Sequence, residues 1–119
     1  MASRYLTRGK FPTPLDREAV ARKWRGHGYS CGALVDPPGR AWEGYVHDVD
    51  ELACVIEGRL AIEVAGESFA VEPGDEVFIP AHAVHSVRNV HPGATRWLYG
   101  YGRGADASGP MNSQSSSRR

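Results

Sequence analysis

The chain has 119 residues, of which 41% are hydrophobic, and this is enough apolar material for one core but not for two. Its fourteen basic and fourteen acidic residues cancel, so the charge balance gives no support to a nucleic-acid or membrane partner. No apolar run approaches the roughly 18 residues of a membrane span, and the N-terminus lacks the apolar core of a secretory signal, so we expect a cytoplasmic protein. Two cysteines, Cys31 and Cys54, are too few for a disulfide scaffold, and we expect both to be reduced and buried.

The N-terminal part of the chain predicts an arm followed by a short helix. The first thirteen residues carry basic side chains, Gly9 and Pro12 without periodicity, which indicates an extended arm or a strand that adds to a neighbouring sheet, ordered by a partner. Thr13 and Pro14 then fit a helix cap and the first helical residue, and a helix-compatible run with one apolar stripe continues to Arg25. We expect this helix to cover an end or an edge of a sheet.

From Tyr29 onward, the sequence predicts short strands separated by proline and glycine turns at intervals of about ten residues. Between Gly58 and Gly66, apolar and polar residues alternate, as expected for a strand with one buried face. This pattern is typical of a sandwich or a barrel. The other predicted strands cover residues 29–35, 41–46, 51–57, 68–71, 77–79, 86–90 and 95–101.

The chain therefore divides into three parts: an N-terminal arm (1–13), one β-barrel domain with its leading helix (14–102) and a C-terminal tail (103–119). The tail ends in Ser-Gln-Ser-Ser-Ser-Arg-Arg and has too little apolar surface to order itself, so we expect it to be disordered. Because so small a barrel exposes strand edges, we expect these edges and the arm to pair in a homodimer.

Three side chains of metal-binding type, His47, Glu51 and His85, lie at spacings that a small β-barrel can bring together. In a strand that runs from His47 to Glu51, residues i and i+4 face the same way, so the imidazole and the carboxylate would enter one cavity. Two neutral imidazoles and one carboxylate can hold Fe(II), Mn(II), Ni(II) or Zn(II) and leave positions open for water or substrate. Each residue taken singly is more often an ordinary side chain, so the prediction depends on the whole set.

The same stretches resemble the two conserved motifs of the cupin superfamily, written G-x5-H-x-H-x3,4-E-x6-G and G-x5-P-x-G-x2-H-x3-N. The resemblance covers about residues 29–101 and departs from the motifs at the leading glycine of the first, at its first histidine and at the inner glycine of the second. It implies a small single-domain cupin, with an all-β double-stranded β-helix (jelly-roll) barrel and a short N-terminal helix. The matching positions are His47, Glu51 and Gly58 in the first motif, and Gly74, Pro80, His85 and Asn89 in the second.

Tyr45 stands where the first cupin motif has its first histidine. The resemblance therefore implies a two-histidine, one-carboxylate metal site, which is the set used by non-haem Fe(II) oxygenases, so Fe(II) is favoured over Mn, Ni and Zn. Tyr45 is the catalytic candidate, and its role is open between a phenolate ligand, a hydrogen-bond donor, an acid/base group and an aromatic wall of the pocket. His82, at the inner glycine position, is placed outside the set of ligands, and Asn89 and Pro80 are interpreted as structural.

Two further groups of residues are candidate substrate contacts. The aromatic residues either line a pocket or belong to the core, and the arginines either anchor a substrate carboxylate or, as we favour, lie at the solvated surface. These candidates are Trp42, Phe78, Trp97, Tyr99 and Tyr101, and Arg40, Arg88 and Arg96.

Small cupins carry out several kinds of reaction, so the resemblance does not choose one. The first hypothesis is a metal-dependent enzyme that acts on a small oxygen-bearing organic substrate, either as a dioxygenase or as an isomerase or cyclase through a metal-bound enolate. The alternative is a non-catalytic cupin module that binds a small molecule or a sugar. In both cases the expected partner is a small molecule rather than a nucleic acid or a membrane.

Overall fold

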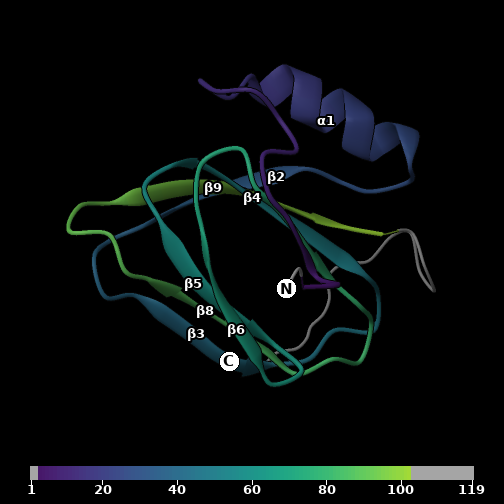
Figure 1. The fold of residues 1–119 in the computed structure, drawn as a ribbon. Helices are drawn as coiled ribbons and strands as arrows, with labels where there is room; N and C mark the ends of the chain where they lie inside the picture. Colours follow the sequence, from purple (N-terminus) through teal and green to yellow (C-terminus); the bar gives the residue numbers. More distant parts are fainter. Residues whose placement is uncertain (1–2, 103–119) are drawn as a thin grey trace.

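The computed structural model describes residues 3–102, which form one helix and nine strands (Figure 1). The eight strands predicted between residues 29 and 101 are present, with ends that differ by a few residues, whereas the strand expected from His47 to Glu51 is not formed. The elements are β1 (Leu6–Thr7), α1 (Arg17–Gly26), β2 (Gly32–Asp36), β3 (Ala41–Tyr45), β4 (Glu51–Glu57), β5 (Leu60–Val64), β6 (Glu67–Val71), β7 (Glu76–Ile79), β8 (His85–Asn89) and β9 (Thr95–Tyr101).

The strands form two antiparallel sheets, which face each other in Figure 1. One sheet has the strand order β1-β7-β4-β9-β2, and the other has the order β3-β8-β5-β6. Most neighbours within a sheet are not consecutive in sequence, so the chain crosses repeatedly from one sheet to the other. This arrangement confirms the predicted all-β jelly-roll barrel with a short N-terminal helix.

The main core lies between the two sheets and consists of the inward-facing residues of both. Strand β5 shows the reason most clearly, because Leu60, Ile62 and Val64 are fully buried while Glu63 is exposed. The cluster is completed by Ala53, Val55, Val71, Val77, Ile79, Val87 and Trp97.

A second apolar cluster lies on the outer face of the larger sheet, beneath α1. Val20 and Trp24 of the helix pack there against Leu52, Cys54 and Leu98. Strand β4 is therefore buried on both faces over its first five residues, and its sequence does not alternate. In Figure 1 the helix lies over β2, β4 and β9, so it covers the outer face of the larger sheet rather than the end or the edge expected from the sequence.

The helix begins later than the sequence suggests. Its N-cap is Asp16, whose carboxylate accepts hydrogen bonds from the backbone N–H groups of Glu18 and Ala19. Thr13 and Pro14, which we expected to start the helix, lie before it. Aspartate and threonine are both good caps, and here the aspartate satisfies the free N–H groups of the first turn.

The N-terminal arm adds to a sheet of its own chain. Strand β1 pairs with β7 in the register Leu6 to Val77, and the buried side chain of Asp75 accepts hydrogen bonds from Arg8 and from the backbone of Gly9. The described part of the arm is therefore held by contacts within its own chain. Pairing of two chains stays a prediction, and the tail 103–119 lies outside the described residues.

The two cysteines are free: Cys54 is buried as predicted, whereas Cys31 is only half-buried. Burial raises the pKa of the Cys54 thiol to about 12, which keeps it protonated and unreactive at neutral pH. Within residues 3–102, no helix is long and apolar enough to span a membrane.

Candidate metal centre

Two of the three predicted ligands are the first residues of strands. Glu51 begins β4 and lies between Ile79 of β7 and Tyr101 of β9, while His85 begins β8. Both are buried, with side chains that are 6% and 5% exposed, respectively. Hydrogen-bonded neighbours on both sides of β4 and β8 fix these two positions on different sheets, so the site joins the two halves of the barrel.

His47 reaches the site from a loop, which corrects the strand expected from His47 to Glu51. Strand β3 ends at Tyr45 and β4 begins at Glu51, so the two ligands do not meet through the alternation of one strand. The loop is tied down at His47, whose carbonyl accepts a hydrogen bond from the backbone of His82. The carboxylate of Asp50 accepts another hydrogen bond from the backbone N–H of Ala81. The segment from His47 to Asp50 therefore lies beside the loop that precedes β8.

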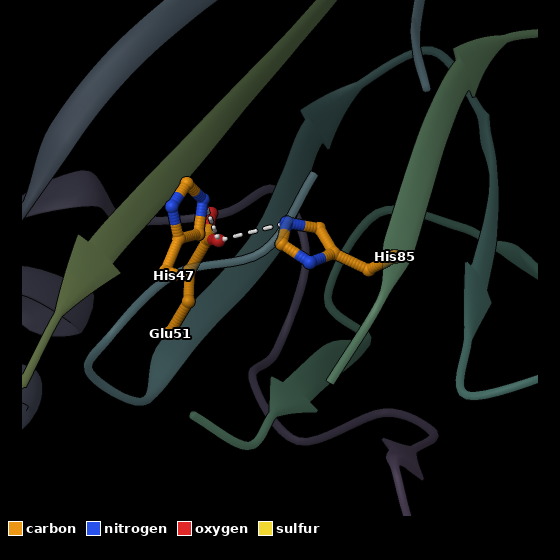
Figure 2. Close-up of side chains that lie close together, drawn as sticks. All are labelled: His47, Glu51 and His85. Atoms are coloured by element: carbon orange, nitrogen blue, oxygen red, sulfur yellow. Dashed lines mark ion pairs between the residues drawn. The ribbon is translucent and has the colours of Figure 1, made fainter. Parts of the chain in front are cut away.

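The three side chains converge on one point (Figure 2). Oε1 of Glu51 lies 3.3 Å from Nε2 of His47 and 3.5 Å from Nε2 of His85. Each of the three residues offers one possible ligand atom, and these three atoms all lie within 4.8 Å of one another. Ligand atoms bound to one ion at about 2.1 Å and at tetrahedral angles lie about 3.4 Å apart. The spacing around Glu51 therefore suits a first-row metal ion.

The carboxylate of Glu51 has an unsatisfied oxygen. Oε1 is buried and has no hydrogen-bond partner among the described residues, although two imidazole nitrogens lie near it. Burial raises the pKa of Glu51, but the two histidines more than offset this effect and leave the pKa below its ordinary value. A buried, charged oxygen without a donor is costly, and a bound cation would compensate for it.

The protonation of His85 follows from its second ring nitrogen. Nδ1 lies 3.2 Å from the carbonyl oxygen of Ala83, which can only accept a hydrogen bond, so Nδ1 carries the proton. In the neutral imidazole, this tautomer has its lone pair on Nε2, the atom that faces Glu51. Metal-binding histidines are commonly oriented in this way by a backbone carbonyl. Sequence reasoning missed this contact because a backbone group has no residue-type signal.

Tyr45 lies beside the three candidate ligands. It pairs with His85 across β3 and β8, and its ring centroid is 6.5 Å from that of His85 and 6.3 Å from that of His47. Tyr101, the cross-strand neighbour of Glu51, also contacts His47, with a centroid distance of 5.1 Å. The structure thus brings the predicted catalytic tyrosine to the site and adds a second phenol.

The other motif residues have structural positions. His82 is exposed and adopts a φ of 70°, a left-handed conformation that explains why the cupin motif has glycine there. The side chain of Asn89 is buried and donates to the carbonyls of Asp36 and Gly93 while accepting from Thr95. Pro80 precedes the turn that leads into β8.

The candidate arginine anchors all lie at the surface, as favoured from the sequence. Arg88 forms an exposed ion pair with Glu43, Arg96 is exposed, and the guanidinium of Arg40 stacks on Trp42 at 4.2 Å. They are not among the residues that converge on Glu51.

Comparison with known proteins agrees with this architecture. A model of the cupin domain matches residues 34–101. The TT1209 protein from Thermus thermophilus is 27% identical, with a TM-score of 0.59 over 64% of this chain and 73% of that one. An oxalate oxidase is 22% identical (TM-score 0.57; 62% and 41% of the two chains). A cupin 2 domain-containing protein from Halorhodospira halophila is 17% identical (TM-score 0.59; 63% and 52%).

The match covers about half or less of the oxalate oxidase and of the Halorhodospira halophila protein. Because their sequence identity to this chain is low, the similarity concerns the fold alone. No curated protein matches this sequence.

Proposed function

The chain belongs to the cupin family, and on this premise we propose that it is a metal-dependent enzyme acting on a small oxygen-bearing organic substrate. His47, Glu51 and His85 would hold one divalent cation, for which Fe(II) is favoured by the ligand set and Mn(II), Ni(II) and Zn(II) are the alternatives. The observation that carries the proposal is the buried Oε1 of Glu51, which lies between two imidazole nitrogens and has no hydrogen-bond donor among the described residues.

A bound divalent cation supplies Lewis-acid stabilisation of negative charge on a substrate oxygen, which serves oxygen-dependent cleavage as well as isomerisation or cyclisation. The protein supplies the remaining parts. Glu51 contributes negative charge, and His85 offers Nε2 because Ala83 holds the proton on Nδ1. The phenol of Tyr45, beside both imidazoles, is the group that we assign to hold or move a proton at its hydroxyl.

The first experiment measures metal. Protein purified anaerobically is expected to carry, or to take up from added Fe(II), one equivalent of metal by elemental analysis. A variant with both His47→Ala and His85→Ala is expected to lose affinity by at least about a hundredfold, because each removes a ligand. His27→Ala is the matched control, since this histidine is exposed at the C-terminus of α1. Absence of metal binding in the wild-type protein would overturn the proposal.

The second experiment tests catalysis. Oxygen uptake with a panel of enols, dicarbonyls and phenols distinguishes a dioxygenase from a redox-neutral isomerase or cyclase, whose products are followed by mass spectrometry. A non-catalytic module that binds a small molecule or a sugar is the second candidate, and Tyr45 in place of a histidine favours it. Saturable ligand binding without turnover by the metal-loaded protein would support that candidate.

A further inference from the structure

Five aromatic side chains, Trp42, Tyr45, Tyr99, Tyr101 and Trp97, form a chain of contacts that passes through the candidate metal centre. We call them the aromatic girdle. Successive ring centroids lie 6.0 Å apart from Trp97 to Tyr99, 5.8 Å from Tyr99 to Tyr101 and 6.1 Å from Tyr45 to Trp42. His47 bridges the gap, with its ring 5.1 Å from Tyr101 and 6.3 Å from Tyr45.

Asp36 closes the girdle into a ring. Its buried Oδ2 accepts a hydrogen bond from the indole N–H of Trp42 at 3.0 Å and from that of Trp97 at 3.1 Å. Trp97 is buried in the core, and the half-buried Trp42, whose indole donor is used in this way, has only carbon and π surface left to offer a ligand.

The candidate ligands are cross-strand neighbours of the girdle. Glu51 is paired with Tyr101 across β4 and β9, and His85 is paired with Tyr45 across β3 and β8. Paired residues project from the same side of a sheet, so these tyrosines face the side on which the carboxylate and the imidazole meet. The girdle tyrosines are half-buried, in contrast to the fully buried aliphatic residues deeper in the barrel. The His47 side chain is also 18% exposed, so the site is open to solvent at this level.

Positive charge is missing from the interior of the described part of the chain. Every lysine and arginine within residues 3–102 is exposed, including Arg40, which touches the girdle by stacking on Trp42. A ligand with a second carboxylate would therefore place that charge against aromatic carbon without a buried cation to neutralise it. A planar, uncharged ring would instead make offset or edge contacts with the tyrosines.

We propose that the candidate metal centre selects substrates with an aromatic or similarly planar unsaturated ring next to the oxygen donors that bind the metal. This inference rests on the metal site proposed above. The donors bind at His47, Glu51 and His85, and the half-buried members of the girdle contact the ring. Aliphatic dicarboxylates whose second carboxylate lies against the girdle rather than at the metal are disfavoured by the same surface.

Two hydroxamates test this selectivity, because they share one metal-binding group and differ in the substituent. Zn(II)-loaded protein is titrated calorimetrically with benzohydroxamate and with acetohydroxamate. We expect benzohydroxamate to bind at least about tenfold more tightly, because its phenyl ring buries more apolar surface than a methyl group.

Variants show whether the girdle causes the preference. Tyr99 contacts Tyr101 and Trp97 rather than the ligands, so Tyr99→Leu should leave Zn(II) affinity unchanged and lower the benzohydroxamate preference by about two- to tenfold. Gly32→Ala is a milder second variant, since its added methyl group would lie 2.7 Å from the Tyr99 ring and displace it. Phe78→Leu is the matched control, because Phe78 packs in the cluster beneath α1.

The outcomes separate the two proposals. Failure of the wild-type protein to bind Zn(II) or Fe(II) would remove the metal site and this inference with it. Zn(II) binding with equal affinity for the two hydroxamates would overturn the inference and leave the metal site intact. A preference that neither Tyr99→Leu nor Gly32→Ala lowers would also overturn it.

Discussion

Glu51 is the residue on which the candidate site depends most. Its carboxylate lies at the start of a strand buried on both faces, and its Oε1 lacks a donor among the described residues. In an apolar interior, an unsatisfied carboxylate oxygen lowers stability unless a cation compensates for it. Nε2 of His47 and Nε2 of His85 lie 3.3 and 3.5 Å from this oxygen, so the three side chains together are arranged as candidate ligands of one cation.

His82 provides a test at the scale of one residue. A φ of 70° costs a non-glycine residue about 1–2 kcal/mol of folding free energy. Glycine removes this cost, but its greater flexibility in the unfolded chain offsets part of the gain. His82→Gly should therefore stabilise the fold by about 0.5–1 kcal/mol, measured as the free energy of unfolding in urea. His82→Ala keeps the strain and should show no such gain. Metal affinity should be unchanged in both, and a large loss in either would show that this imidazole is a ligand.

At the scale of elements, the sequence predicted the strands well because their ends are local signals. The run from Leu60 to Val64 alternates, and glycine or proline marks the turns on both sides. The strand expected from His47 to Glu51 was predicted wrongly, because the positions of His47, Val49 and Glu51 fit strand alternation while the chain in fact leaves the sheet after Tyr45 and returns to a strand only at Glu51. Whether a segment pairs depends on neighbours distant in sequence, and a local pattern cannot supply that information.

The same limit applies to the arm and to the site. The pairing of β1 with β7 depends on Asp75, which is distant in sequence from Arg8 and Gly9. The three ligand types were predictable from their spacing and from the cupin motifs, and they do meet. The aromatic girdle was not predictable as a ring, since its closure depends on Asp36, whose two hydrogen bonds reach different sheets.

Substitution of Asp36 tests how the two sheets are joined. It lies at the end of β2 and accepts from Trp97 of its own sheet and from Trp42 of the other. Asp36→Ala leaves two indole donors without a partner and should lower the free energy of unfolding by about 2–4 kcal/mol. Asp36→Asn keeps an acceptor oxygen and should cost less. The measurement is urea unfolding followed by tryptophan fluorescence, and a loss below about 1 kcal/mol for Asp36→Ala would contradict this role.

At the scale of the whole molecule, the candidate metal centre joins the two sheets, because Glu51 belongs to one and His85 to the other. An ion that binds only the folded protein stabilises it by about 2.7 kcal/mol at a hundred times its dissociation constant. For a domain of this size, that gain corresponds to a rise in Tm of about 10–20 °C.

We therefore expect added Zn(II) or Fe(II) to raise the Tm and a chelator to reverse the shift. The variant with His47→Ala and His85→Ala should show neither effect, whereas His27→Ala should behave like the wild-type protein. An equal shift in the double variant would indicate that the metal binds elsewhere.

The attachment of the three ligands to elements of different kinds has a consequence for kinetics. Glu51 and His85 are held by strands within the sheets, whereas His47 lies on the loop between β3 and β4. Loops open more often than central strands, so an ion in this site would lose His47 first and rebind it last. The lifetime of the bound ion would then be governed by the opening of residues 46–50, and substitutions in that loop at positions other than His47 would change the rate of metal exchange more than the affinity.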